Sequence, residues 1–338
     1  GETTITVTTE DGGFTATCKV KVTGMAFENE GEDGIDGSSW DKAYTIKNKD
    51  QFMLLATRIN GNESYKWNTK FYKLLDNIDL GIIEWTPIGT GSSNLYFKGG
   101  FDGAGYSISG TLTIKDTQEY AGIFGFGINA TIQNLSFKGS ISEHKNTNGN
   151  LGAIVGYATD TQIVNCHNTA ALNGANNVGG ITGGNVDGAI IACSNSGALT
   201  GLFTGGIIGY SSRSKTIGCF NIANATTSNS AGGIVGYGTT NSATITTACW
   251  SISTISGTGN YKGGIIGQNN GKLEYCYWKT TAGISKAAGR GTAENCATFS
   301  DDTPNADQIK AMNDAWQADD ANREYQFNAT TGMIEKKP

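Results

Sequence analysis

The chain has 338 residues, of which 49 are glycine and only 3 are proline. This length allows a large core and one to three domains, and the glycine content favours many turns and short strands over long helices. A net charge of −6 with only 24 basic residues argues against nucleic-acid binding, and no run of 18 apolar residues predicts membrane insertion. No signal-peptide pattern precedes Gly1, so we expect a mature or trimmed piece of a longer protein.

Residues 1–24 predict a β-hairpin. Alternation of apolar residues runs through "TITVTTEDGGFTATCKVKVT", and Asp11-Gly12 supplies the turn. The segment resembles the last two strands of a bacterial Ig-like domain of the second type. Because two strands alone are marginally stable, we expect this hairpin to lean on a neighbouring domain or molecule.

Residues 28–42, "ENEGEDGIDGSSWDK", are acidic and rich in glycine. One interpretation is a linker with turns. The other is a calcium loop that uses Asp33 and Asp36, although their spacing does not follow the EF-hand pattern.

Two helices are expected, one near each end of the chain. The first covers about 49–60, with Phe52, Leu55, Ala56 and Ile59 on one face. The second opens at Thr303-Pro304 and runs to about Trp316, within a C-terminal helix and cap region of residues 301–338. Short strands fill 72–114, and a strand, a glycine turn and a tail are expected after the second helix.

A phrase such as "GGIVGY" recurs six times at intervals of 26 to 31 residues. Two places before its last glycine the residue is always isoleucine: Ile123, Ile154, Ile181, Ile207, Ile234 and Ile265. Nine to thirteen residues after that glycine comes a second mark, which is a cysteine in all but the first repeat: Cys166, Cys193, Cys219, Cys249, Cys276 and, in a further half-repeat, Cys296. Leu135 takes this position in the first repeat, which indicates a buried apolar slot.

These regularities predict an all-β, right-handed parallel β-helix over residues 25–300, with equivalent residues stacked about 4.8 Å apart. The leader covers 40–120 and the repeats 121–300. Isoleucines form one interior ladder and cysteines another, and Asn168, Asn195 and Asn221 form a possible amide ladder. Since Ile132 and Leu135 are three residues apart and both apolar, we expect a bend between them, as between Ile163 and Cys166.

The phrase "GGIVGY…C…N…G" resembles the GLUG repeat of bacterial surface proteins. The stretch "YKLLDNIDL…WTPIG…FKGGFDGAGYSISGTLTI" is similar to the leader of such repeats. GLUG repeats occur in adhesin-like proteins and in the non-catalytic part of IgA1-specific metallopeptidases. The resemblance therefore implies secretion and display at the cell surface, in association with the outer membrane.

Catalytic motifs are weak. The two histidines, His144 and His167, do not form H-E-x-x-H, so a zinc peptidase centre is not expected in this chain. We expect His144 to be a solvated loop residue. His167, beside Cys166, is expected at a corner or facing outward, the alternative being a metal ligand or nucleophile.

The acidic residues of the repeats, Glu143, Asp160, Asp187 and Glu274, are scattered, which argues against a glycosidase pair. Asp76, Asp79 and Asp102 of the leader belong to the resemblance motif and could cap turns. The cysteines are expected to be free thiols, with disulfides or a metal cluster as alternatives, and no C-x-x-C occurs. The phosphate-loop interpretation of "GGIVGYG" fails because neither loop motif nor following helix is present.

A binding role remains. Tyr157, Tyr210 and Tyr237 follow the last glycine of the phrase, as does Phe126, and stacking would line them up as an aromatic surface. Trp250 and Trp278, with Tyr277, form a second candidate patch. The alternative is that these rings only pack against loops. We expect a non-catalytic, adhesin-like module that binds a host glycan or glycoprotein, including IgA or matrix protein, and needs no cofactor; an accessory region of a secreted IgA1-type metallopeptidase is the alternative, and a polysaccharide-acting enzyme the third.

Overall fold

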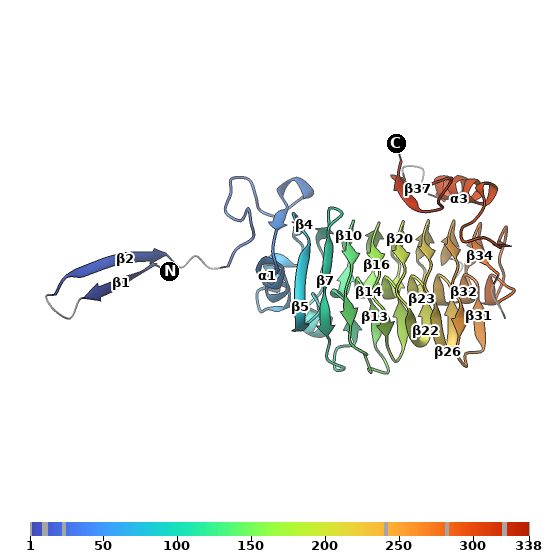
Figure 1. The fold of residues 1–338 in the computed structure, drawn as a ribbon, viewed down its shortest axis with the longest axis horizontal. Helices are drawn as coiled ribbons and strands as arrows, with labels where there is room; N and C mark the ends of the chain where they lie inside the picture. Colours follow the sequence, from blue (N-terminus) through green and yellow to red (C-terminus); the bar gives the residue numbers. More distant parts are fainter. Residues whose placement is uncertain are drawn as a thin grey trace.

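The computed structural model describes residues 2–8, 13–21, 25–239, 243–280, 284–319 and 323–337. The chain winds into a right-handed parallel β-helix of about nine turns, so the expected fold class is confirmed (Figure 1). Equivalent strands of successive coils pair in parallel and in register, which builds four sheets along the stack.

Within the described residues, two of these sheets meet at the corner before the cysteine position. The strands of the nine-stranded sheet are β3 (Tyr44–Ile46), β4 (Phe71–Leu74), β6 (Gly100–Asp102), β10 (Thr131–Gln133), β15 (Gln162–Val164), β20 (Ala189–Ile191), β24 (Lys215–Ile217), β28 (Ile245–Thr247) and β33 (Lys272–Glu274). The strands of the ten-stranded sheet are β5 (Ile78–Glu84), β7 (Ser107–Thr113), β11 (Ser136–Phe137), β12 (Ser140–Ile141), β16 (His167–Asn168), β21 (Ser194–Asn195), β25 (Phe220–Asn221), β29 (Trp250–Ser251), β34 (Tyr277–Lys279) and β36 (Ala297–Phe299).

The other two sheets meet at the recurring glycine phrase, again counting described residues. The strands of the eight-stranded sheet are β8 (Tyr120–Ala121), β13 (Asn150–Gly152), β17 (Leu172–Asn173), β18 (Asn177–Gly179), β22 (Leu199–Gly205), β26 (Ala225–Gly232), β30 (Ile255–Ser256) and β31 (Tyr261–Gly263). The strands of the seven-stranded sheet are β9 (Phe124–Ile128), β14 (Val155–Thr159), β19 (Thr182–Val186), β23 (Ile208–Ser212), β27 (Val235–Gly238), β32 (Ile266–Gln268) and β35 (Ala288–Arg290).

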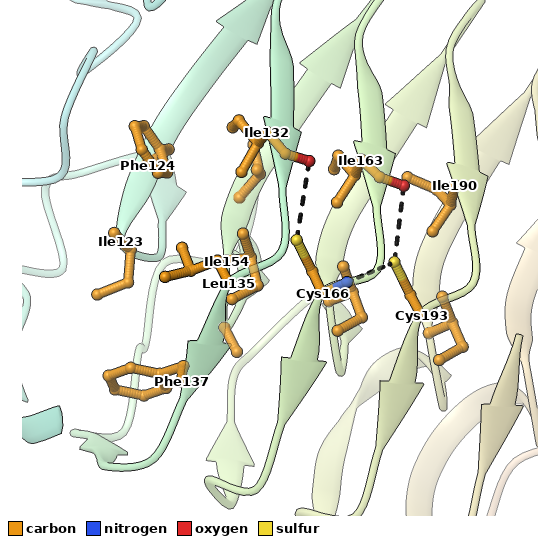
Figure 2. Close-up of a cluster of buried hydrophobic side chains, with 14 of the residues drawn as sticks. Ile123, Phe124, Ile132, Leu135, Phe137, Ile154, Ile163, Cys166, Ile190 and Cys193 are labelled. Atoms are coloured by element: carbon orange, nitrogen blue, oxygen red, sulfur yellow. Dashed lines mark hydrogen bonds between the residues drawn. The ribbon is translucent and has the colours of Figure 1, made fainter. Parts of the chain in front are cut away.

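The isoleucines of the phrase lie inside the coil, each with no exposed surface: Ile123, Ile154, Ile181, Ile207, Ile234 and Ile265. Five cysteines form a second buried column beside them: Cys166, Cys193, Cys219, Cys249 and Cys276. Figure 2 shows the start of this column, where the Cys166 thiol donates to the Ile132 carbonyl oxygen (3.7 Å) and the Cys166 backbone N–H donates to the Cys193 sulfur (3.4 Å). The sulfurs therefore bind to backbone groups of neighbouring coils.

The expected bend before the cysteine position is confirmed. The residue just before each slot has a positive φ: Asn134 (53°), Asn165 (51°), Ala192 (55°), Gly218 (63°), Ala248 (52°), Tyr275 (49°) and Asn295 (52°). This left-handed residue turns the chain between two sheets, so residues three apart both point inward. That is why Ile132 and Leu135 are both buried.

The glycine doublets of the phrase allow close approach across a thin coil. At Gly180, an added Cβ would lie 2.2 Å from the Gly206 carbonyl oxygen and 2.5 Å from the Asn195 side-chain carbon. The side chains of the Asn ladder therefore pack against this corner from the opposite side of the coil. Its amides are linked along the stack, from Asn168 to Asn195 (2.8 Å) and from Asn195 to Asn221 (2.8 Å).

Helix α1 (Lys49–Asn60) lies at the N-terminal end of the stack, as the sequence predicts (Figure 1). Asn48 caps it, and Phe52 stacks on Trp85 of the leader at 5.7 Å. Helix α2 (Ser64–Trp67) follows, and short 3₁₀ turns lie at Trp40–Lys42 and Ser92–Asn94. Aromatic packing thus covers the first coil.

An N-terminal hairpin of β1 (Glu2–Thr8) and β2 (Thr15–Lys21) precedes this end, in antiparallel register. It stands apart from the coils in Figure 1. The turn expected at Asp11-Gly12 lies outside the described residues.

The C-terminal segment, residues 301–319 and 323–337, is called the strap. It contains α3 (Ala306–Asp319) and an antiparallel hairpin of β37 (Tyr325–Phe327) and β38 (Ile334–Lys336). The helix starts two residues later than expected, because Asn305 and Gln308 form a reciprocal capping box in place of Thr303-Pro304. The segment expected to be a tail after the glycine turn instead forms strand β38, which pairs with β37.

The strap lies along one side of the stack and not across its C-terminal end (Figure 1). Ile309, Met312 and Trp316 of α3 pack with Trp250 and other outward apolar residues in a second core. The Trp250 indole N–H donates to the Gly332 carbonyl oxygen (3.0 Å). The cap expected at this end is therefore a lateral brace.

The Asn ladder gives a first prediction. The Asn195 amide donates to the Gly197 carbonyl and to Asn221, and its oxygen accepts from the Gly197 N–H and from Asn168. Because all these partners are buried, Asn195→Ala should lower the free energy of unfolding by about 2–4 kcal/mol. Urea denaturation measures this. The exposed Asn173→Ala serves as the control and should change it by less than about 0.5 kcal/mol; equal effects would contradict the ladder's role.

The strap contact gives a second prediction. A Cβ on Gly218 would lie 2.3 Å from the Trp316 ring, so Gly218→Ala should push α3 off the stack. We expect faster proteolysis of the strap with an unchanged β signal in circular dichroism. Gly105→Ala has the same left-handed backbone but nothing within 4 Å of the new methyl, so it controls for backbone strain. Equal protease resistance in the two variants would refute the contact.

Candidate functional site

An aromatic row runs along the seven-stranded sheet, on the corner that follows the glycine phrase. It is defined by one register position of successive coils, occupied by Phe126, Tyr157, Gly184, Tyr210 and Tyr237. The four rings are partly exposed. The stack therefore brings together Tyr157, Tyr210 and Tyr237, the residues that the sequence places in a binding surface.

A neighbouring row on the eight-stranded sheet was missed by the sequence analysis. Its register position holds Tyr120, Asn150, Asn177, Phe203, Ser230 and Tyr261. In most repeats the residue of this neighbouring row lies seven positions before the residue of the aromatic row. A comparison of the repeats at that offset would have revealed the second row. Phe203 contacts Tyr237 at 5.4 Å, and Tyr120 contacts Tyr157 at 5.5 Å between ring centroids. The two rows form one surface.

Gly184 divides this surface into two aromatic clusters. A Cβ there would lie 2.6 Å from the Tyr157 ring, which leans over the glycine. Next to this notch, the Asn177 amide donates to Asn150 Oδ1 (2.9 Å). These amide groups thus lie between the Tyr157 ring and the Tyr210 ring. The Tyr210 ring stacks on that of Tyr237, with 5.9 Å between the ring centroids.

Two phenols of this surface have a raised pKa. Burial raises the pKa of Tyr157 and of Tyr120, so both phenols keep their protons well above neutral pH. Aromatic faces beside amides suit the apolar faces and hydroxyl groups of sugars, or a protein surface.

The second expected patch is not on the surface. Trp250 is fully buried, stacked on Phe220 at 4.9 Å beneath the strap, and Tyr277 belongs to the same core. Trp278 is 6% exposed and packs against Gly264. The expectation of exposure is wrong for these rings, because the strap covers Trp250 and Tyr277 and Trp278 points into the coil.

The two histidines are parts of the packing. His144 is 1% exposed, so its expected place in a solvated loop is wrong; its Nε2 lies 2.8 Å from the Gln118 carbonyl oxygen. His167 lies at the outward position of β16, between Ser194 (2.8 Å from Nδ1) and Asn165 (3.1 Å from Nε2). Burial lowers the pKa of both imidazoles.

Carboxylates approach one another at one corner. Asp160 and Asp187 lie at equivalent positions of adjacent coils. Together with Arg213 and Lys215 they line a cavity of about 370 Å³. The Arg213 guanidinium donates two hydrogen bonds to Asp187 (2.7 and 2.5 Å), and this holds the pKa of the carboxyl below its usual range. Such a carboxylate stays ionised near neutral pH, so Asp187 does not supply the protonated acid that a glycosidase pair needs at this corner.

In the acidic loop, one of the two candidate aspartates takes part in a turn. Asp36 accepts a hydrogen bond from the Ser38 N–H (2.9 Å), which is a local turn. Within the part of the chain that the structure describes, no three His, Cys, Asp or Glu side chains gather to hold a metal. No helix among these residues has the length and apolar character needed to cross a membrane.

The cysteine column consists of free thiols throughout the described residues. Burial raises the pKa of Cys166 and Cys193 well above its ordinary value. Cys296 ends the column and is only partly buried. Its pKa is lowered mainly by a hydrogen bond from the Cys276 thiol, with a further contribution from the Cys276 backbone N–H. Among the described thiols of the column, Cys296 alone is not fully buried, so it is the one that a reagent can reach.

The coil geometry defines the chain as a parallel β-helix protein, and one solved structure agrees. It is described as "a putative immunoglobulin A1 protease from Bacteroides ovatus"; the similarity has a TM-score of 0.65 at 19% identity and covers 89% of this chain and 94% of that one. At this identity the similarity supports the fold. No family model and no curated protein matches the chain.

The thiol column gives a third prediction. In a Cys18→Ser background at pH 8, iodoacetamide should modify Cys296 first and leave Cys166 and Cys193 intact in the folded protein. Peptide mass spectrometry measures this, and Cys296→Ala should abolish the early labelling. Labelling of Cys166 at a rate similar to Cys296 would contradict the burial of the column.

Proposed function

We propose that the chain is a non-catalytic, surface-exposed or secreted module that binds a host glycan or glycoprotein through the aromatic row and its neighbouring row. The observation that carries the proposal is the alignment of partly exposed aromatic rings on one corner of a stack held in register. Rings on such a scaffold lose little freedom on binding, which favours recognition.

The main alternative is an accessory region of a secreted IgA1-type metallopeptidase. The fold similarity to the Bacteroides ovatus protein favours it. In that case IgA1 would be the partner and the peptidase centre would belong to another part of the parent protein. Both proposals assign binding, not cleavage, to this chain.

Secretion, outer-membrane association and membership among GLUG-repeat proteins belong to the same proposal. They are supported by the resemblance of the repeated phrase. A stack of short parallel strands also suits display outside the cell, because it holds the side chains of a binding surface in a fixed row.

The experiment is a binding screen of the whole chain against a host glycan array, IgA1 and fibronectin. We expect one class to bind, and the double variant Tyr157→Ala/Tyr210→Ala to weaken binding at least tenfold, as truncation of aromatic anchors does. Thr200→Ala, on an exposed strand position outside both rows, should leave the affinity unchanged.

Two outcomes separate the proposals, and two others would refute a part that both share. Binding confined to IgA1 favours the accessory region, and glycan or matrix binding favours the adhesin-like module. Undiminished binding by the double variant would remove the role of the aromatic row. Cleavage of IgA1 by this chain alone, seen on a gel, would refute a non-catalytic role.

A further inference from the structure

A second surface, independent of the aromatic row, lies where the strap meets the nine-stranded sheet. Two cavities, of about 560 and 270 Å³, open on either side of the strap hairpin. They share Asn134, Glu324 and Tyr325 as walls, so together they form one trough, here called the strap groove. Its size falls within the range of small-ligand sites.

The wall between the two cavities is fixed by hydrogen bonds. The Tyr325 hydroxyl donates to Asn134 Oδ1 (2.9 Å), which also accepts from the Asn165 amide (2.9 Å). The Asn134 amide in turn donates to Asp102 Oδ1 (3.0 Å). Side chains from three coils and from the strap are thus held in one arrangement before any ligand arrives.

Two amides of the groove are unused. Gln133 and Gln162, on neighbouring strands β10 and β15, line the smaller cavity, and their side chains make no hydrogen bond within the described residues. An amide carries both donors and an acceptor, so each glutamine is able to pair with a hydroxyl group in two ways.

The floor of the same cavity is apolar and includes Val164, Ile191 and Trp316. Trp316 has no exposed surface, and its indole N–H has no acceptor within the described chain. Because this N–H is sealed from solvent, Trp316 contributes packing beneath the apolar floor and not a donor to the cavity. The Arg323 guanidinium covers the ring at 5.1 Å.

The charges of the groove balance. Its lining contains three basic and three acidic side chains: Lys73, Arg323, Lys336, Asp102, Glu324 and Glu335. An anionic chain would face the three carboxylates, and a cationic one the three basic groups. Hence the lining favours a ligand without net charge.

We propose that the strap groove binds a short neutral oligosaccharide. The apolar floor suits the C–H face of a sugar ring, the amides of Gln133 and Gln162 suit its hydroxyl groups, and the balanced charges suit its neutrality. This site does not depend on the function proposed for the aromatic row, and it exists only because the strap lies across the coils.

The experiment titrates the whole chain with cellotetraose, maltotetraose and xylotetraose, followed by saturation-transfer NMR and calorimetry. We expect binding of at least one of them, and a loss of about three- to tenfold in affinity for each of Gln133→Ala and Gln162→Ala. Thr200→Ala, at an exposed position of strand β22, is the control and should bind as the unchanged protein does.

Three results would overturn the proposal. The first is no binding of any of the three tetrasaccharides. The second is tighter binding of tetragalacturonate, an anionic probe of the same length. The third is binding that Tyr157→Ala/Tyr210→Ala abolishes while Gln133→Ala/Gln162→Ala retains it, because this would place the sugar on the aromatic row.

Discussion

The structure depends on the stacking of equivalent residues in register, one coil above another. Every side chain must then tolerate its own counterpart about 4.8 Å away, as well as the opposite wall of a thin coil. Ile154 and Cys193 meet the first demand as small apolar side chains. Asn195 tolerates its counterparts because its amide donates to the asparagine of one neighbouring coil and accepts from that of the other. Gly180 tolerates the opposite side of the coil because it has no side chain.

The same rule fixes the surface. An outward position, once set by the backbone, repeats along the stack, so Tyr157, Tyr210 and Tyr237 fall into line without any further interaction. On another side of the coil, the outward positions that include Phe220 and Trp250 are apolar, and the strap covers them. One side thus keeps its aromatic rings partly exposed, while the other is covered by the chain's own C-terminal segment.

This division explains what the sequence could predict. Repetition makes the ladders readable, because each position is seen several times, and the bend before Cys166 follows from two buried residues three apart. Features that occur once could not be read in this way. The burial of His144 and Trp250 comes from contacts that occur once, with Gln118 and with the strap. The neighbouring row at Tyr120 and Phe203 mixes aromatic and polar residues, which obscures the column.

The strap also changes how the stack resists force. Hydrogen bonds between coils run along the long axis, so a pull on one end would peel coils off singly, the last coil first. The strap joins Thr298 near the end, through Gln308, to Asn134 several coils away, through Tyr325. The coils between these two points are therefore tied together by the strap as well as by their own hydrogen bonds, which favours their separation as a group over separation one at a time.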